Sequence, residues 1–226
     1  MIEFLKDFYF PSQLLTDNDF NKMCVGGKVL EQDERGVKVI QLTNGEILKI
    51  FRVRRWFSGA RVYSHARRFC RNALRLRLLD IPTVNVKSLF HLEKSGHSAV
   101  LYQPLAGETF RHLVRHDLGR IQTANITFGL FLADLHKKGI HFHSLHTGNI
   151  LLLPNNQFGL IDISDMTIYP WSLGCSTRIR SFKRLCKYQT DFEVLGKMYW
   201  KTMMQAYINA SNCSYACVNK LLGFRD

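Results

Sequence analysis

Residues 142–152 read Phe-His-Ser-Leu-His-Thr-Gly-Asn-Ile-Leu-Leu, and residues 158–162 read Phe-Gly-Leu-Ile-Asp. These two segments carry Asn149 and Asp162, and the apolar run before Asp162 is typical of a strand that ends at a carboxylate. Carboxylate and amide oxygens are the ligands that Mg²⁺ prefers. Because Mg²⁺ keeps several waters, one Asp and one Asn are sufficient protein ligands. Asn149 and Asp162 are therefore candidate ligands for Mg²⁺, although taken singly Asp162 is typical of a residue that caps a turn and Asn149 of a turn residue.

The chain around this loop is rich in helix signals. A helix is predicted over residues 126–138, and it stops at Gly139, a typical helix-ending residue. Its apolar side chains share one face: Phe128, Phe131, Leu132 and Leu135. A shorter helix is predicted around residues 110–115, and one or two closing helices are predicted after residue 188.

The front of the chain is rich in strand signals instead. Residues 25–51 predict a small antiparallel sheet, with strands at 29–30, 37–42 and 46–51. Asn44-Gly45 is a strong two-residue hairpin signal between the last two strands. Lys49 lies in mid-strand between apolar neighbours, where a sheet would otherwise take a hydrophobic residue.

Next come a helix from about residue 63 to 79 and two further strands at 84–86 and 98–102. The helix has Phe69, Ala73 and Leu76 on one stripe. The regular pattern then breaks at residues 103–107. We therefore expect an α+β protein of two parts, residues 1–102 and residues 103–226.

With these motifs in place, the chain resembles the protein-kinase-like superfamily. It resembles in particular the small bacterial branch with an H-G-D-L-H-x-G-N-I-L loop and an I-D-F element. Within that branch it is most similar to the lipopolysaccharide core kinases, which phosphorylate Kdo or heptose in Gram-negative bacteria, and to small relatives known as toluene-tolerance proteins. The resemblance runs from about Val25 to Tyr199, and its specific part is confined to the loop, Asp162 and the segment around Ile81-Pro82.

This resemblance implies a two-lobe, protein-kinase-like fold with a small antiparallel-sheet N-lobe and a reduced, mainly helical C-lobe. It implies ATP and Mg²⁺ as cofactors and a sugar hydroxyl of the lipopolysaccharide core as the acceptor. Lys49 would contact the nucleotide phosphates, and Gln103 to Leu105 would form the adenine-binding hinge. Asn149 and Asp162 would bind the nucleotide through the metal.

The first departure from the family pattern is at the catalytic Asp, whose place is taken by Ser144. A hydroxyl can hydrogen-bond a substrate alcohol but cannot accept its proton at neutral pH. General-base help is worth roughly 10²–10⁴-fold in rate, so its loss slows transfer without abolishing it. His143, His146 or Asp165 could substitute as the base, and the sequence does not choose among them.

Two further departures concern the phosphate-binding region. No Asp or Glu occurs from residue 47 to residue 79, so the helix that should pair with Lys49 has no carboxylate. Either Asp162 or Asn72 orients this lysine, or the ion pair of the active state is absent. There is also no G-x-G-x-x-G loop, and the turn at residues 31–36 is acidic, which makes it a poor cradle for a triphosphate.

The chain is strongly basic, with 31 Lys and Arg against 18 Asp and Glu, a net charge of +13. Such a balance favours anionic partners. Ten cations follow one another without an acidic residue between them: Lys49, Arg52, Arg54, Arg55, Arg61, Arg67, Arg68, Arg71, Arg75 and Arg77. This stretch is either a solvated face or a patch for lipopolysaccharide core, another anionic glycolipid or the inner-membrane surface. No nucleic-acid-binding module is recognisable, so specific nucleic acid binding is not expected.

The N-terminus, Met1 to Asp7, is unlike a signal peptide, and no apolar run approaches the ~20 residues of a spanning helix. Six scattered cysteines without a C-x-x-C pair are expected to be reduced thiols. We therefore expect a cytoplasmic protein, in peripheral contact with the cytoplasmic face of the inner membrane if the basic stretch binds lipid.

Three functions remain open from the sequence. The leading hypothesis is a kinase acting on a sugar hydroxyl of the lipopolysaccharide core. Its rival is a pseudokinase, a binding or regulatory module that keeps the fold but transfers nothing, which Ser144 favours. A small-molecule phosphotransferase resembling the aminoglycoside phosphotransferases is less favoured. Aminoglycosides are cations, and the basic surface of this protein would repel them.

Overall fold

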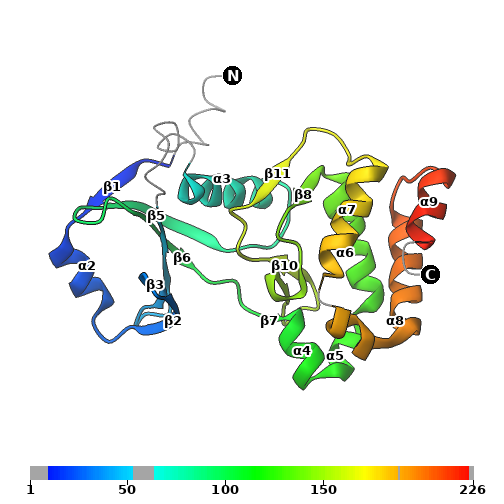
Figure 1. Ribbon diagram of the computed structural model, residues 1–226, viewed down its shortest axis with the longest axis horizontal. Helices are drawn as coiled ribbons and strands as arrows, with labels where there is room; N and C mark the ends of the chain where they lie inside the picture. The colour runs from blue at the N-terminus through cyan, green and yellow to red at the C-terminus, as the bar shows by residue number, and fades with distance from the viewer. Residues whose placement is uncertain (1–9, 53–63, 188, 224–226) are drawn as a thin grey trace. The chain divides into compact units, whose positions relative to one another are not determined.

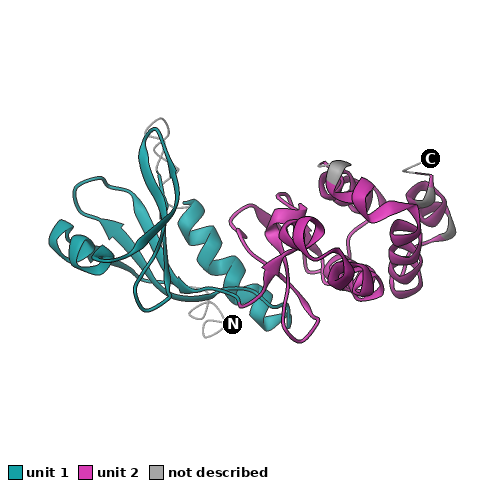
Figure 2. Ribbon diagram, turned by 90° about the horizontal axis from the view of Figure 1, so that it is seen from below, with its two compact units in different colours: residues 1–105 teal, residues 106–226 magenta. Residues whose placement is uncertain are grey.

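The computed structural model describes residues 10–52, 64–187 and 189–223, and the protein is α+β. The chain forms two compact units, Met1–Leu105 and Ala106–Asp226 (Figure 2). Several sequence expectations concern positions outside the described residues, namely the N-terminal Met1 to Asp7, the helix start at Tyr63, and Arg54, Arg55 and Arg61.

Unit 1 is built on a six-stranded sheet in the order β1-β5-β6-β4-β3-β2. In chain order its elements are β1 (Ser12–Leu15), α2 (Asp17–Cys24), β2 (Lys28–Asp33), β3 (Gly36–Gln41), β4 (Ile47–Phe51), α3 (His65–Leu78), β5 (Asn85–Leu92) and β6 (Ser98–Gln103). β1 pairs in parallel with β5, whereas the other neighbours are antiparallel. The expectation of an antiparallel sheet is therefore wrong at this edge, because no hairpin joins β1 to β5 and fixes its direction.

The predicted turn at Asn44-Gly45 does join β3 to β4, but its loop has three residues, 43–45, instead of the two that were predicted. Gly45 has a positive φ of 83°, and Leu42 N donates to Glu46 O at 2.8 Å. The resulting register places Lys49 opposite Val39 on one side and opposite Val100 of β6 on the other. Lys49 thus belongs to an interior strand of the sheet.

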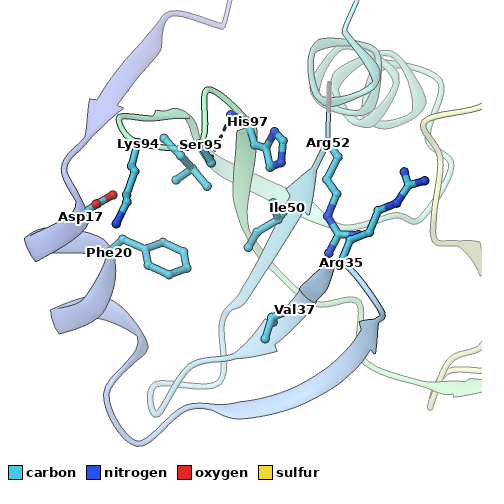
Figure 3. A pocket seen from close by; sticks show the side chains of 10 residues that line it. Asp17, Phe20, Arg35, Val37, Ile50, Arg52, Lys94, Ser95 and His97 are labelled. Atoms are coloured by element: carbon cyan, nitrogen blue, oxygen red, sulfur yellow. Dashed lines mark hydrogen bonds between the residues drawn. The ribbon is translucent and has the colours of Figure 1, made fainter. Parts of the chain in front are cut away.

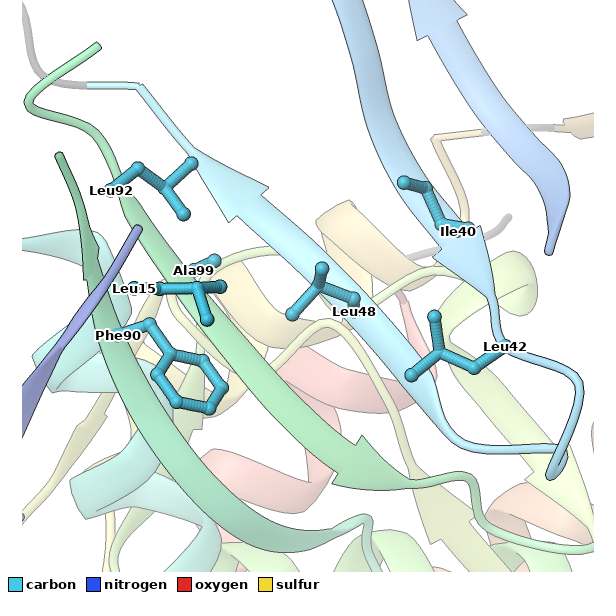
Figure 4. Close-up of a cluster of buried hydrophobic side chains, with 7 residues drawn as sticks. All are labelled: Leu15, Ile40, Leu42, Leu48, Phe90, Leu92 and Ala99. Atoms are coloured by element: carbon cyan, nitrogen blue, oxygen red, sulfur yellow. The ribbon is translucent and has the colours of Figure 1, made fainter. Parts of the chain in front are cut away.

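The two faces of this sheet are covered differently. One face carries a cluster of buried side chains, Leu15, Ile40, Leu42, Leu48, Phe90, Leu92 and Ala99 (Figure 4). Phe20 and Met23 of α2 pack against this cluster. The other face is covered by α3, whose predicted apolar stripe of Phe69, Ala73 and Leu76 is buried. Burial of this stripe confirms the helical period read from the sequence.

Unit 2 combines helices with two small sheets, ordered β10-β9-β7 and β11-β8. In chain order its elements are β7 (Glu108–Thr109), α4 (Phe110–His116), α5 (Leu118–Thr123), α6 (Asn125–Lys137), β8 (Ile140–Phe142), η2 (Thr147–Asn149), β9 (Ile150–Leu152), β10 (Phe158–Leu160), β11 (Met166–Ile168), α7 (Cys175–Leu185), α8 (Gln189–Ala210) and α9 (Tyr215–Leu222). The sequence analysis did not anticipate α5 or α7.

Close packing of α6 against α8 forms the centre of unit 2 (Figure 1). At Gly129 of α6, a Cβ would overlap the backbone of Met203 in α8, so only glycine permits this approach. Phe128 of α6 also contacts Phe110 and Phe158, with ring centroids 4.8 and 5.0 Å apart. These aromatic contacts hold β10 against α4 and α6, and so fix the strand that ends near Asp162.

The expectation that all cysteines are thiols is wrong for two of them. Cys175, the first residue of α7, forms a disulfide with Cys217 of α9, 42 residues later in the sequence. Sequence spacing could not reveal this pair, because the fold brings together the starts of two helices that are far apart in the chain. Cys24, Cys70, Cys186 and Cys213 remain free.

None of the helices in the described part of the chain is both long and apolar enough to cross a membrane.

A buried polar network joins α6, α7 and α8. The Nδ1 atom of His136 lies 2.8 Å from the hydroxyl oxygen of Tyr207, and Arg178 Nη1 donates to the same oxygen at 3.0 Å. Burial, with the nearby Arg178 charge, lowers the pKa of His136 to about 3. His136 is therefore neutral in the folded protein across the physiological range.

We expect this histidine to make stability depend on pH. In the unfolded chain the imidazole has its ordinary pKa of about 6.5. In the folded protein it binds a proton only near pH 3, so the unfolded state is the more protonated one between these values. The free energy of unfolding therefore falls as the pH drops below about 6.5, with a contribution of roughly 3 kcal/mol between pH 7.5 and 4.5. Urea unfolding of His136→Asn should show a loss smaller by that amount. The exposed His116→Asn is the control, and equal pH dependence in both variants would contradict the assignment.

Candidate functional site

The predicted catalytic loop connects β8 to β9 and is held by its own polar groups. His146 Nδ1 accepts a hydrogen bond from Gly148 N at 3.1 Å, and Asn149 N donates to His146 O at 2.9 Å. Leu145 is buried between two half-buried residues, Ser144 and His146. The apolar side chain anchors the loop, and Ser144 stays within reach of solvent.

Asn149 and Asp162 lie at the same end of the β9–β10 hairpin. Ile150 pairs with Leu160, and just beyond this pair Ile161 N donates to Asn149 O at 3.0 Å. Asp162 is the next residue after Ile161, so the thirteen-residue spacing in the sequence becomes proximity in space. The structure thus brings together the two residues that the sequence assigns to a metal.

The side chains of both residues are suited to a hard cation. Asn149 is buried, and its Nδ2 donates to Ser144 O at 3.0 Å. Its Oδ1 has no hydrogen-bond partner within the described residues. Asp162 is exposed and has a φ of +52°, in a region that residues other than glycine seldom adopt. Such strain is found preferentially at functional sites.

A buried carboxylate that the sequence analysis missed holds the loop in place through a hydrogen bond. Asp191 of α8 accepts hydrogen bonds from Thr147 Oγ1 and from Arg111 Nε of α4, the latter at 3.1 Å. The Asp191 side chain is only 4% exposed, so losing a partner would leave a buried charge uncompensated. The sequence signal was weak, because an Asp in the first turn of a helix ordinarily stabilises the helix dipole.

The loop histidines are poorly placed to act as bases. Burial and then the neighbouring Arg111 charge lower the pKa of His146, so its ring is neutral, and Nδ1 already accepts from Gly148. The proton of the neutral ring is then on Nε2, which makes His146 a donor. His143 uses both ring nitrogens, with Arg184 Nη1 at 3.2 Å from Nδ1 and Thr167 Oγ1 at 3.1 Å from Nε2.

Asp165 is exposed and adjoins the loop through its backbone, whose carbonyl accepts from His143 N at 3.0 Å. Because β11 pairs with β8, this contact places Asp165 across from the residue that precedes Ser144. The sequence left three residues open as substitute bases. Asp165 is the one of them whose ability to accept a proton is not reduced by hydrogen bonds to an imidazole ring.

In unit 1, Lys49 projects from β4 toward the helix that covers the sheet. Its Nζ lies 5.6 Å from the ring centroid of Phe51 and 5.9 Å from that of Phe69 in α3. Asn72, one of its two predicted partners, is a buried polar residue on the apolar face of the same helix. Gln103 is exposed at the end of β6, and Leu105 is half-buried at the end of the unit.

A hollow in unit 1 is separate from these residues (Figure 3). It has a volume of about 360 Å³ and combines four apolar side chains with four basic ones, Phe20, Val37, Ile50, Leu92, Arg35, Arg52, Lys94 and His97. Ile50 follows Lys49 in β4, so the two side chains point to opposite faces of the sheet. A second groove, of about 480 Å³, lies between α6 and α8. Neither hollow includes a predicted site residue.

No group of three or more His, Cys, Asp or Glu side chains suited to a metal occurs in residues 10–52, 64–187 and 189–223. A site of one Asn and one Asp lies outside that definition. No protein-family model matches the chain, and no curated protein is significantly similar to it.

Proposed function

We propose that this chain is an ATP- and Mg²⁺-dependent phosphotransferase of the protein-kinase-like superfamily, acting on a sugar hydroxyl of the lipopolysaccharide core. The observation that carries the proposal is the hydrogen bond from Ile161 N to Asn149 O, which sets Asn149 beside the residue preceding Asp162. A kinase-like, two-lobe fold is part of the proposal. It is supported by a unit with a sheet lysine and one covering helix, followed by a helical unit that carries the loop.

The donor set fits Mg²⁺, because the Asn149 amide oxygen and the Asp162 carboxylate are hard oxygen ligands. When bound, the ion would neutralise charge on the phosphate oxygens of ATP. Asn149 Nδ2 is held by Ser144 O, and that hydrogen bond orients the amide so that Oδ1 is left for the cation.

Lys49 would contact the nucleotide phosphates. Its place between Phe51 and Phe69 limits the directions that the long side chain can take, which reduces the entropy lost on binding. Gln103 and Leu105 would border the adenine. Gln103 ends β6, where it pairs with Asn85, and the next two residues belong to neither helix nor sheet.

In the proposed reaction, the acceptor hydroxyl oxygen forms a bond to the γ-phosphorus, the bond from that phosphorus to the β–γ bridging oxygen breaks, and ADP leaves. The hydroxyl proton passes to a base. Ser144 would hydrogen-bond the acceptor hydroxyl, and His146 would donate through Nε2 to a phosphate oxygen. Asp165 is the best-placed substitute base, because its carboxylate is exposed and His143 anchors its backbone.

A second candidate, the pseudokinase, is favoured by a specific observation. Ser144 cannot accept a proton, and the hydrogen bonds of His143 and His146 leave neither ring suited to the role. A chain of this kind would bind nucleotide and metal through the same residues without transferring phosphate.

Nucleotide binding is the first test of the proposal. Calorimetric titration with ATP should show binding that requires Mg²⁺ and is weakened at least tenfold in Asp162→Asn, because a charged ligand to the metal is lost. Glu193→Gln is the matched control, since Glu193 is an exposed acid of α8. ATP binding that is absent, or unaffected by both Mg²⁺ and Asp162→Asn, would contradict the proposed site.

Phosphate transfer separates the two candidates. If Ser144 only replaces a base in an active enzyme, Ser144→Asp should keep turnover or raise it by up to about 10²–10⁴-fold, and Ser144→Ala should lower it modestly. The rate is measured as ADP release with core sugars as acceptors. A large loss of turnover in Ser144→Asp would contradict the hypothesis that Ser144 replaces a base in an active enzyme. Intact ATP binding with no turnover in any variant would establish the pseudokinase.

We also propose a cytoplasmic location with peripheral contact between α3 and an anionic lipid or glycolipid surface. The support is the composition of α3, which carries Arg67, Arg68, Arg71, Arg75 and Arg77 and no acidic residue. Burial, followed by the charge of Arg71, lowers the pKa of Arg75, so these cations act on one another. An anionic surface would relieve that repulsion.

Vesicle binding tests this contact. Reversal of Arg67, Arg68 and Arg71 to Glu should weaken binding to anionic vesicles about a hundredfold, and added salt should weaken the wild type. The matched control reverses three exposed lysines of the same unit, Lys28, Lys87 and Lys94. Equal weakening in both triple variants, or binding that salt does not change, would remove the membrane proposal.

A further inference from the structure

Arg184 of α7 is held beside the loop in an unusual way. Its Nη1 lies 2.8 Å from Nε2 of His141 and 3.2 Å from Nδ1 of His143, and the two imidazole rings have centroids 4.2 Å apart. A guanidinium only donates hydrogen bonds, so both ring nitrogens must accept, and both rings must be neutral. Burial lowers the pKa of His141 to about 4, with further contributions from His143 and Arg184, in agreement with a neutral ring.

The positive charge of Arg184 is therefore oriented without being neutralised. Its two hydrogen-bond partners, His141 and His143, are uncharged, and it forms no ion pair with a carboxylate within the described residues. The remaining nitrogens, Nε and Nη2, have no hydrogen-bond partner in the same part of the chain. Structural arginines are normally paired, as Arg111 is with Asp191. An arginine that is held in place but unpaired is suited to receive an anion.

Neighbouring charges reinforce this character. Arg180 and Arg184 lie four residues apart on α7, which packs beside β8 (Figure 1), and Lys187 follows in the turn after this helix. Arg180 acts on the His141 ring, and Lys187 acts on the His146 ring. Between Asp165 and Asp191 the sequence contains no acidic residue. Asp165 acts on His141 without forming an ion pair with Arg184, whereas Asp162 and Asp191 act on the His146 ring.

The site adjoins the position proposed for chemistry. His143, which holds Arg184, is directly followed by Ser144, and the Asn149 side chain is bonded to the Ser144 carbonyl. An anion bound at Arg184 would accordingly lie near the acceptor hydroxyl.

We propose that Arg184 binds a phosphate or carboxylate group of the acceptor, so that the hydroxyl to be phosphorylated belongs to a negatively charged sugar. The planar fork of a guanidinium matches two oxygens of either group. The catalytic part of this inference rests on the proposed function, whereas the anion site itself does not require phosphate transfer.

Binding of simple anions to the full chain, without ATP, tests the site. The probes are glucose 6-phosphate, glucuronate, inorganic phosphate and glucose. The readout is the ¹⁵N chemical shift of the His141 and His143 ring nitrogens, with dissociation constants from the titration curves. We expect the anionic sugars to bind at least tenfold more tightly than glucose and to shift both rings. The ratio between glucose 6-phosphate and glucuronate distinguishes a phosphate site from a carboxylate site.

Arg184→Gln should weaken the anionic probes at least tenfold, and Arg184→Lys should give a smaller loss, because it keeps the charge and a donor to the histidines but lacks the fork. Lys201→Gln, which removes an exposed charge from α8, is the control and should change binding less than twofold. Binding of glucose as tight as that of the anions, no binding of any probe, or equal effects of Arg184→Gln and Lys201→Gln would overturn the proposal.

Failure here is distinguishable from failure of the proposed function. Calorimetry of the Arg184→Gln variant with ATP and Mg²⁺ should match the wild type, because the nucleotide is assigned to other residues. Retained nucleotide binding with no anion selectivity would overturn the Arg184 site alone. Anion selectivity without nucleotide binding would support the site and contradict the phosphotransferase.

Discussion

The register of the β9–β10 hairpin is the constraint on which the candidate site depends. Ile150 opposite Leu160 sets Asn149 opposite Ile161, and Asp162 follows at once. A slip of one residue would turn every side chain of the strand to the other face. Such a slip is opposed by Phe158, whose ring is enclosed by aromatic rings from α4 and α6. Packing of an apolar core thus sets the position of two polar residues that take no part in it.

Around the hairpin, most polar groups of the loop are already used by the protein. Gly148, Thr167 and Arg184 hydrogen-bond to the imidazoles of His143 and His146. The buried Asp191 carboxylate accepts a hydrogen bond from Thr147. Within the part of the chain that the structure describes, an amide oxygen on Asn149 and two guanidinium nitrogens on Arg184 are among the polar atoms without a hydrogen-bond partner. One is suited to a cation and the other to an anion. A phosphorylated or acidic ligand that binds together with a metal ion needs both kinds of group: an oxygen ligand for the cation and a cationic donor for the anion.

The sequence predicted correctly those elements whose conformation depends on their own residues. The turn at Asn44-Gly45 and the helix stop at Gly139 were predictable because a positive φ is written into the residue type. By contrast, α2 has only eight residues and none is fully buried, so its apolar stripe of Phe20, Met23 and Cys24 is too short to predict a helix. Asn149 and Asp162 were recognisable from spacing within one hairpin. Asp191, Arg184 and the Cys175–Cys217 pair were not, because their roles come from contacts between distant segments.

The tie between Asp191 and Thr147 also sets an order of events during synthesis. Chains emerge from the ribosome N-terminus first, and Thr147 emerges 44 residues before Asp191. Until α8 has left the exit tunnel, Thr147 and Arg111 lack the acceptor that they share in the folded protein. The loop that looks most like a motif in the sequence is therefore among the last parts of unit 2 to be completed, and a nascent or truncated chain that ends before α8 contains the motif without the site.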